Sequence, residues 1–177
     1  MQHQITFSKI LATLSLVAFS FTGCTSPGET EPVATPDSVA TNIKAYTHVW
    51  EEIMNHRKLE MFNDSNFSNN VVLRANPTDV VGLKNFKTYY GNFLTGFSDI
   101  QFTIKDIFGQ GNKLVKYWNF KGKHTGPFFG IPATGNSVNI DGTTLVLMDK
   151  GKIAEERDFF DNLEFMTQLG ELPPAVK

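Results

Sequence analysis

The chain has 177 residues, a length that fits one ordinary domain and leaves little room for a second. Hydrophobic residues make up 41% and charged residues 19%, which is a globular composition and excludes an intrinsically disordered chain. The formal net charge is −2, so the composition gives no reason to expect a nucleic-acid partner. The sequence therefore predicts one packed domain.

The first 23 residues have the three parts of a bacterial export signal. Lys9 supplies a basic start, and residues 10–21 form an apolar run that is too short to span a bilayer. The following Phe21-Thr22-Gly23-Cys24 resembles the lipobox of bacterial lipoproteins, although Phe21 departs from the usual Leu. Cys24 is the only cysteine and cannot form an intramolecular disulfide. We expect a lipid on Cys24; an ordinary secretory signal with an incidental cysteine is the alternative.

Residues 24–40 have the composition of a flexible tether, rich in Pro, Ser, Thr, Gly and acidic residues. The folded domain is expected over residues 41–170, with a C-terminal tail at 171–177. Thr25 stands where an Asp would favour retention in the inner membrane of a lipoprotein. We therefore expect an exported, membrane-attached protein at the outer membrane or the periplasmic face of the cell envelope.

Helices are expected in the first half of the domain. Over residues 41–57, apolar residues recur at three- and four-residue spacing, which predicts a helix with one buried face. Residues 59–67 predict a second short helix or a turn. Thr78 or Asp79 is expected to cap a further helix that runs to Leu94.

Strands dominate the second half, because apolar residues alternate with polar ones after Gly96. A brief strand at residues 71–73 comes earlier. The long strands are expected at residues 100–107, 114–124, 138–148 and 153–160, with a helical turn at 162–169. Helices followed by an antiparallel meander predict an α+β fold with helices on the concave side of a curved sheet.

Two motifs then point to a known family. Residues 122–126 (GKHTG) with 128–135 (FFGIPATG), and residues 151–161 (GKIAEERDFFD), are similar in order and spacing to segments of the SnoaL-like polyketide cyclases, which have the nuclear transport factor 2-like fold. The resemblance covers roughly residues 41–170. It implies a cone-shaped α+β barrel, in which a curved antiparallel sheet wraps around the N-terminal helices.

The sequence departs from the family pattern at three positions. Arg157 replaces a common Trp, Arg74 a common His, and Thr144 a common Asp or His. These changes alter the polarity expected for the pocket and leave the scaffold intact. Cyclase activity therefore does not follow from the resemblance.

Asp158 matches the aspartate that the resemblance implies as the acid/base of an intramolecular aldol closure. Strand alternation places Ala154, Glu156, Asp158 and Phe160 on one face of the strand. It places Ile153, Glu155, Arg157 and Phe159 on the other face. Proton abstraction from carbon requires a base that is partly shielded from water. The alternative is that Asp158 is a structural partner of an arginine or of the backbone.

His124 shares a strand face with Trp118 and Phe120, and it could hydrogen-bond an enolate oxygen or relay a proton. A purely structural role in shaping the glycine-rich loop is the favoured reading. Phe128 and Phe129 in that loop either close the mouth of an apolar pocket or form a dimer contact.

The residues expected to line the pocket are Trp118, Phe120, Phe128, Phe129, Thr144, Glu156, Phe160 and Arg74, with Asp158 and His124 as catalytic candidates. No metal site is expected, because the spacing of His48, His56 and His124 does not resemble a ligand set, and no cofactor is expected.

Two functions remain open. The first is a lipid-anchored domain that binds a small, largely apolar molecule with a carbonyl group and catalyses cofactor-free proton transfer. The second is a non-catalytic ligand-binding module or homodimeric interaction module on the same fold.

Overall fold

The computed structural model describes residues 36–172. The expected export signal, Cys24 and most of the expected tether lie outside the described residues. Helix α1 (Pro36–His56) begins before Thr41, so the end of the expected tether is helical. A proline in the first turn favours this start, because the first N–H groups of a helix have no partner within it. No helix of the described part is both long and apolar enough to cross a membrane.

Helix α1 buries the face that the apolar spacing predicts. Its buried residues are Tyr46, Val49, Trp50, Ile53 and Met54. A single 3-10 turn, η1 (Leu59–Met61), follows it in the region where a short helix or turn is expected.

Helix α2 (Leu83–Gly96) starts later than expected, and the prediction of Thr78 or Asp79 as its cap was wrong. The Asp79 carboxylate is engaged elsewhere: it accepts hydrogen bonds from the Arg74 guanidinium at 2.7 Å and from the backbone N–H of Ala75 at 3.1 Å. The two β-branched residues that follow form a short strand instead of the first helical turn.

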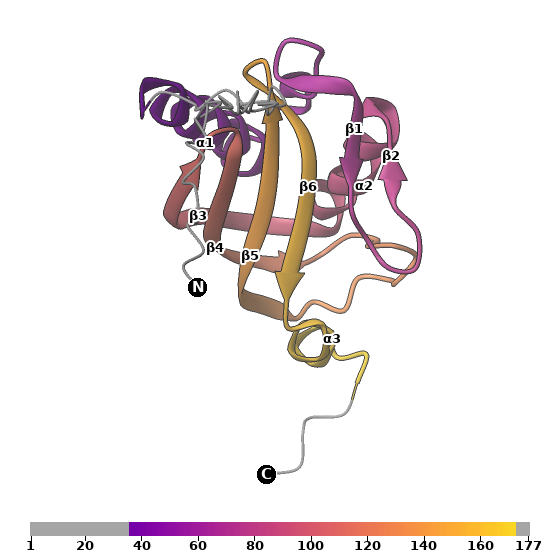
Figure 1. The fold of residues 1–177 in the computed structure, drawn as a ribbon. Coiled ribbons are helices and arrows are strands. Elements are labelled where there is room, and N and C mark those ends of the chain that lie inside the picture. Colours follow the sequence, from indigo (N-terminus) through magenta and orange to yellow (C-terminus); the bar gives the residue numbers. More distant parts are fainter. Residues whose placement is uncertain (1–35, 173–177) are drawn as a thin grey trace, which may run out of the picture. The chain divides into compact units, whose positions relative to one another are not determined.

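The sheet has six strands in the order β2-β1-β6-β5-β4-β3. These are β1 (Phe67–Leu73), β2 (Val80–Val81), β3 (Phe97–Gln110), β4 (Lys113–His124), β5 (Ser137–Asp149) and β6 (Lys152–Phe160). The four long strands form the expected antiparallel meander, but β1 pairs with β6 in parallel, so the sheet is mixed. It is curved and keeps two free edges, β2 and β3, and therefore does not close into the expected barrel (Figure 1).

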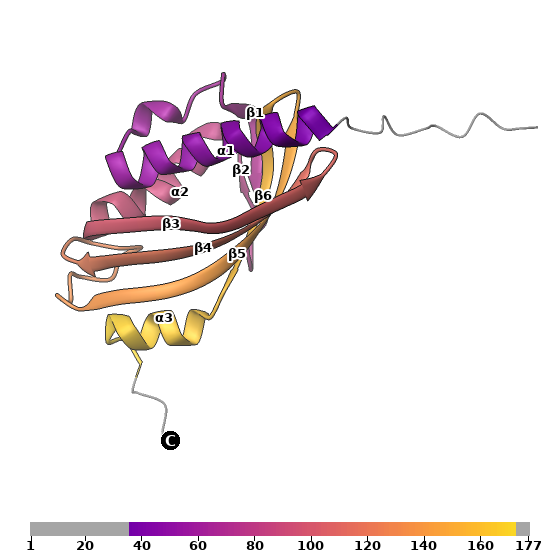
Figure 2. The same cartoon turned by 90° about the vertical axis from the view of Figure 1, so that its left-hand side faces the viewer.

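Helix α3 (Asn162–Leu169) covers the stretch of β5 that β6 leaves unpaired. The register of β5 with β6 runs from Gly142 to Asp149. Before that stretch, Gln168 of α3 accepts a hydrogen bond from the backbone N–H of Asn139 at 2.6 Å and donates one to its carbonyl at 3.2 Å. Figure 2 shows α3 beside β5, on the opposite side of the long strands from α1 and α2. The helix thus protects a strand edge that would otherwise be open.

Helices α1 and α2 cover the inner face of the sheet, and alternate residues of the strands point toward them. On β4 these are Leu114, Lys116, Trp118, Phe120, Gly122 and His124. On β5, Gly142 makes room for this packing, because a Cβ atom there would lie 2.2 Å from the ring of Trp118.

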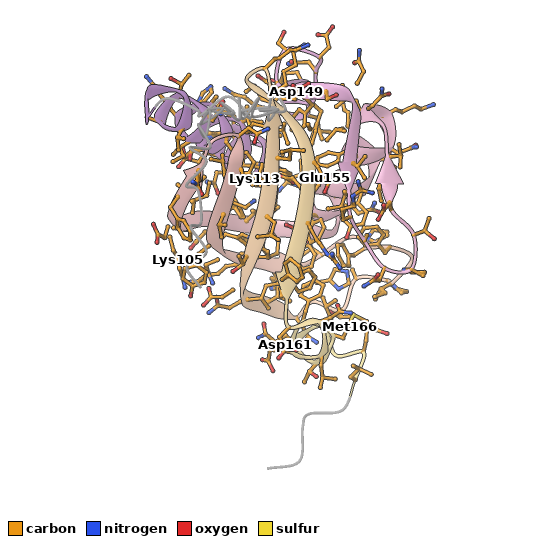
Figure 3. All side chains as sticks on the ribbon, viewed as in Figure 1. Lys105, Lys113, Asp149, Glu155, Asp161 and Met166 are labelled. Carbon is orange, nitrogen blue, oxygen red and sulfur yellow. The ribbon has the colours of Figure 1, made fainter. Side chains whose placement is uncertain are left out.

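A bulge in β6 decides which of its side chains face inward. Leu147 pairs with Glu155 and Met148 with Ile153, so Ala154 is an extra residue on the β6 side. As a result Ile153 and Glu156 are both buried, at 1% and 0% exposure. The expectation that Ile153 lies on the face opposite Glu156 was wrong, because simple alternation takes no account of the extra residue. Figure 3 shows the side chains on the ribbon, including Glu155 on the other face of β6.

Candidate functional site

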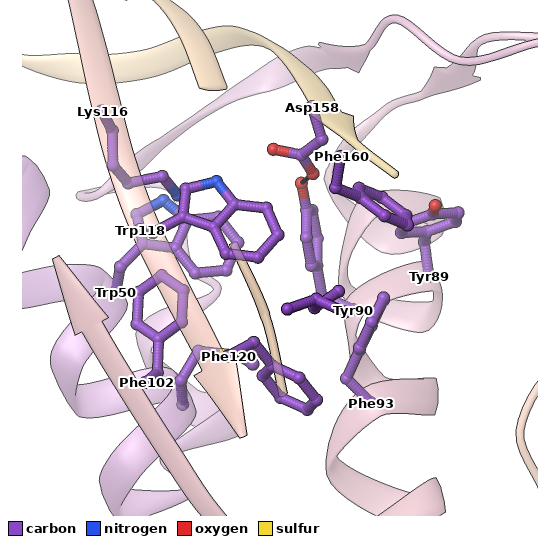
Figure 4. A pocket seen from close by; sticks show the side chains of 12 residues that line it. Trp50, Tyr89, Tyr90, Phe93, Phe102, Lys116, Trp118, Phe120, Asp158 and Phe160 are labelled. Carbon is purple, nitrogen blue, oxygen red and sulfur yellow. Dashed lines mark hydrogen bonds between the residues drawn. The ribbon is translucent and has the colours of Figure 1, made fainter. Parts of the chain in front are cut away.

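A narrow apolar cavity lies between the two covering helices and the inner face of the sheet (Figure 4). Its volume is about 40 Å³, which is room for a few water molecules. The lining residues are Trp50, Met54, Tyr89, Tyr90, Phe93, Phe102, Lys116, Trp118, Phe120, Ile140, Asp158 and Phe160. Ten of these twelve are apolar or aromatic, so the two charged groups, Lys116 and Asp158, decide the chemistry of the cavity.

Asp158 lies in the cavity wall on β6 and is held by two hydroxyl groups. Tyr90 of α2 donates to Oδ2 at 2.7 Å, and Thr144 of β5 donates to Oδ1 at 2.5 Å. The indole N–H of Trp118 donates in turn to the Thr144 hydroxyl at 2.9 Å. Each carboxylate oxygen therefore has one fixed donor and keeps a further lone pair for a ligand.

Glu156 is completely buried behind Asp158. Its Oε1 accepts hydrogen bonds from Tyr46 at 2.5 Å and from Trp50 at 2.8 Å, and its Oε2 lies 3.1 Å from the Tyr90 hydroxyl. Burial raises the pKa of the Glu156 carboxyl to about 7; Lys116 opposes this rise and Asp158 adds to it. Glu156 can thus hold a proton under conditions where a surface glutamate is ionised.

Tyr90 links the two carboxyl groups, because its single hydroxyl lies within hydrogen-bonding distance of both. Burial and the nearby carboxylates raise the pKa of Tyr90 and of Tyr46 well above the usual value of a phenol. Both hydroxyl groups therefore remain protonated and act as donors. The arrangement offers a path along which a proton can pass between Glu156 and Asp158.

The residues expected to line the pocket divide into three groups. Trp118, Phe120 and Phe160 line the cavity with Asp158. Thr144 and Glu156, both fully buried, lie behind the wall and contact it through hydrogen bonds.

The remaining expected residues do not line the cavity. Arg74 is on the outer side, where it forms ion pairs with Asp79 at 2.7 Å and with Glu155 at 2.6 Å. Phe128 is buried against Phe93 and Phe97, with ring centroids 4.9 and 5.1 Å away.

Phe129 is 48% exposed. Its ring centroid is 5.0 Å from that of Tyr89, which lines the cavity. Phe129 is thus next to a lining residue without being one itself.

His124 does not line the cavity that contains Asp158. It is completely buried, with its ring centroid 5.3 Å from that of Phe97. Its Nδ1 lies 3.1 Å from the Thr134 hydroxyl and accepts a longer hydrogen bond from the Thr134 N–H at 3.3 Å. These contacts fix the glycine-rich loop, which agrees with the structural alternative for His124.

Lys116 is a cavity residue that the sequence analysis missed. It is 3% exposed, and its Nζ lies over the ring faces of Trp50, Tyr46 and Phe102 at 4.8, 5.2 and 5.2 Å. The sequence did indicate an inward position for Lys116, because strand alternation places it on the same face as the apolar Leu114, Trp118 and Phe120.

The match to known proteins agrees with this geometry. The family model of SnoaL-like polyketide cyclases matches residues 40–169. The chain belongs to the SnoaL-like polyketide cyclase family. No curated protein sequence matches it significantly.

Solved structures share the SnoaL-like fold at low sequence identity. A protein from Jannaschia sp. CCS1, described as a SnoaL-like polyketide cyclase, has a TM-score of 0.69 and 20% identity, covering 77% of this chain and 95% of that one. AclR from Streptomyces galilaeus, described as a hydroxylase, has a TM-score of 0.67 and 22% identity over 78% of this chain and 87% of its own.

IdmH from Streptomyces antibioticus, described as a polyketide cyclase, has a TM-score of 0.60 and 20% identity, covering 73% of this chain and 98% of its own. At these identities the likeness shows the fold alone. The descriptions name different activities, so the reaction has to be argued from the cavity of this SnoaL-like domain.

The described residues contain no cluster of histidine, cysteine and carboxylate side chains suited to a metal ion. What the cavity does offer is a positioned carboxylate, a buried second carboxyl group and an amine, surrounded by aromatic rings. Such a set can move a proton within an apolar ligand.

Proposed function

We propose that the cavity binds a small, largely apolar molecule with a carbonyl group, and that Asp158 transfers a proton at the carbon beside that carbonyl. The observation that carries the proposal is the position of the Asp158 carboxylate. It lies in an aromatic wall, and Tyr90 and Thr144 fix its orientation. A base held in this way needs little reorganisation when it takes the proton.

The reaction class that fits is a cofactor-free aldol cyclisation or isomerisation. Both begin with removal of a proton from carbon and end with a proton returned to oxygen or carbon. Asp158 can receive the first proton, and Tyr90 connects it to Glu156, whose raised pKa lets that carboxyl group store one.

Binding and proton transfer can be measured separately on the purified chain. Trp50 and Trp118 line the cavity, so a ligand there should change their fluorescence. The probe is 2-methyl-1-phenylbutane-1,3-dione, which has one exchangeable α-proton between two carbonyl groups. The proposal predicts saturable fluorescence quenching and protein-dependent exchange of that proton for deuterium, and it fails if no protein-dependent exchange occurs.

A non-catalytic binding module or a homodimer is the second candidate. The cavity volume of about 40 Å³ favours the homodimer form of this candidate, since a ring-sized ligand can enter the cavity only if aromatic side chains move. A dimer contact is supported by large apolar side chains on the outer face of the sheet, among which Tyr117, Leu145 and Phe159 are 39%, 47% and 46% exposed. Quenching without exchange, or a dimer in sedimentation, would favour this candidate.

We also propose that the chain is exported and attached to the bacterial cell envelope by a lipid on Cys24, at the outer membrane or the periplasmic face. The support is in the sequence: a basic start, a short apolar run and a solitary cysteine at the end of a lipobox-like motif. The cavity would then operate outside the cytoplasm, close to a membrane surface.

A further inference from the structure

Lys116 is the second charged group in the cavity, and the proton transfer proposed above does not use it. Within residues 36–172, its amine has neither a hydrogen-bond partner nor a carboxylate within 4.0 Å. The fully enclosed side-chain N and O atoms without a partner are Thr47 Oγ1 and His124 Nε2. Lys116 Nζ is not one of these atoms, and Lys116 lines the cavity.

The groups around Lys116 do not form a direct ion pair with it. Nζ lies over three ring faces, from Tyr46 and Trp50 of α1 and Phe102 of β3. The carboxyl groups that face it come from β6, and they already accept hydrogen bonds from tyrosine, tryptophan and threonine. A lysine kept inside an apolar cavity without a direct counterion is costly, which calls for a functional explanation.

We propose that Lys116 is a nucleophilic amine that forms a reversible imine with an aldehyde or ketone carbonyl of the bound molecule. The lone pair of the neutral Nζ attacks the carbonyl carbon and forms the C–N bond. The carbonyl oxygen then leaves as water, taking both hydrogens of the amine. Asp158 lies in the same cavity and can supply and recover the protons that the dehydration requires.

This inference rests on the proposed function and extends it, because an imine draws electrons from the neighbouring carbon and makes the α-proton easier for Asp158 to remove. The charge state of the Lys116 amine is consistent with nucleophilic attack. Burial lowers the pKa of Lys116, with Glu156 and Asp158 opposing the shift, so a larger share of the amine is neutral than in a surface lysine.

Reductive trapping tests the inference on the purified full chain. The chain is incubated near neutral pH with propanal or with benzaldehyde in the presence of cyanoborohydride, which converts an imine into a stable secondary amine. Peptide mass spectrometry then gives the labelling rate of each lysine. Lys121 is the matched internal control, because it lies on the same strand and faces solvent.

The inference predicts that Lys116 is labelled several-fold faster than Lys121, because burial lowers the pKa of Lys116 and leaves more of its amine neutral. Lys116→Arg keeps the positive charge but cannot form an imine, and Lys116→Met replaces the amine with an apolar group of similar length. Both variants should lose only this fast label, while Lys121→Met should keep it. Slow labelling of Lys116 with both aldehydes in the wild-type chain would overturn the inference.

The outcome is separable from that of the proposed function. Trapping reports on the Lys116 amine and needs no removal of an α-proton, whereas α-proton exchange reports on Asp158. Exchange that depends on Asp158 without trapping at Lys116 would remove the imine alone. Fast trapping at Lys116 without any exchange would keep the imine and remove the proposed proton transfer.

Discussion

Tyr90 donates its hydroxyl hydrogen to Asp158 across 2.7 Å, the shorter of the two hydrogen bonds available to this phenol. The longer one, at 3.1 Å, is to Glu156. Helix α2 supplies the tyrosine and β6 supplies both carboxyl groups, so packing of this helix on the sheet sets the geometry of the proton path. The proton path between the two carboxyl groups therefore depends on one hydroxyl group that can be removed without changing the ring.

Replacing Tyr90 by Phe should destabilise the domain, because the substitution leaves buried carboxylate oxygens without a donor. One unsatisfied buried acceptor costs about 1–3 kcal/mol, which lowers the melting temperature by several degrees. Tyr89→Phe is the matched control. Tyr89 also lines the cavity, but within the described chain its hydroxyl has no hydrogen bond to a carboxylate. Equal melting temperatures for the two variants would contradict the role given to Tyr90.

Glu156→Gln should change how stability depends on pH. The pKa of Glu156 is raised from 4.5 to about 7 in the folded state, so between these values the unfolded chain releases a proton that the folded chain keeps. The free energy of unfolding of the wild type should then fall as pH rises across this window, by roughly 3 kcal/mol relative to the glutamine variant.

Thermal unfolding of both proteins between about pH 4.5 and 7 measures this difference. Glu155→Gln is the control, because Glu155 precedes Glu156 on the strand and pairs with Arg74 on the outer face. In Glu155→Gln the free energy of unfolding should still fall as pH rises, as in the wild type. A wild-type slope that survives in Glu156→Gln would show that another group causes it.

Gly142→Ala should disturb the cavity wall without touching either carboxyl group. The added Cβ would lie 2.2 Å from the ring of Trp118, so the indole must move and its hydrogen bond to Thr144 is lost. Overpacking of this kind costs about 1–3 kcal/mol. Gly91→Ala in α2 is the control: apart from its chain neighbours and the backbone of its own helix, no atom lies within 4 Å of a Cβ added there, and alanine in a helix should be neutral or stabilising. Equal effects at both glycines would count against the packing argument.

Cys24→Ser should abolish membrane attachment when the chain is expressed in a bacterium. Without a thiol there is no acceptor for the lipid, so the protein should leave the detergent-extracted membrane fraction and appear as unprocessed precursor or soluble protein. Intact mass and fractionation measure both effects. Unchanged mass and unchanged membrane association would remove the lipid anchor.

The order of elements could be predicted because the patterns behind it are local. The apolar spacing around Trp50 predicts α1, and the alternation around Trp118 predicts β4; both are confirmed. The parallel pairing of β1 with β6 could not be predicted in this way, because it joins residues about 80 positions apart and depends on no short-range signal.

The candidate site was predictable in part. Alternation along β6 correctly placed Glu156, Asp158 and Phe160 together, since the bulge at Ala154 lies before them. The burial of Glu156 and its three hydrogen-bonding partners come from α1 and α2, which the strand sequence does not reveal. Lys116 was overlooked because a lysine in an alternating strand is usually assigned to the solvent face.

The central claim is that Asp158 is the base, and the α-proton exchange rate of Asp158→Asn tests it most directly. The amide has nearly the shape of the carboxylate, so the fold should be preserved and the melting temperature should change little. Asp106→Asn is the control, because Asp106 is an exposed aspartate on β3.

The measurement is deuterium exchange into 2-methyl-1-phenylbutane-1,3-dione by NMR, at a probe concentration that saturates the fluorescence change. The account predicts that Asp158→Asn lowers the protein-dependent rate by about 10²–10⁴-fold, as loss of a general base does, while Asp106→Asn keeps the wild-type rate. Equal rates in Asp158→Asn and the wild type, with both proteins folded and binding the probe, would contradict the claim.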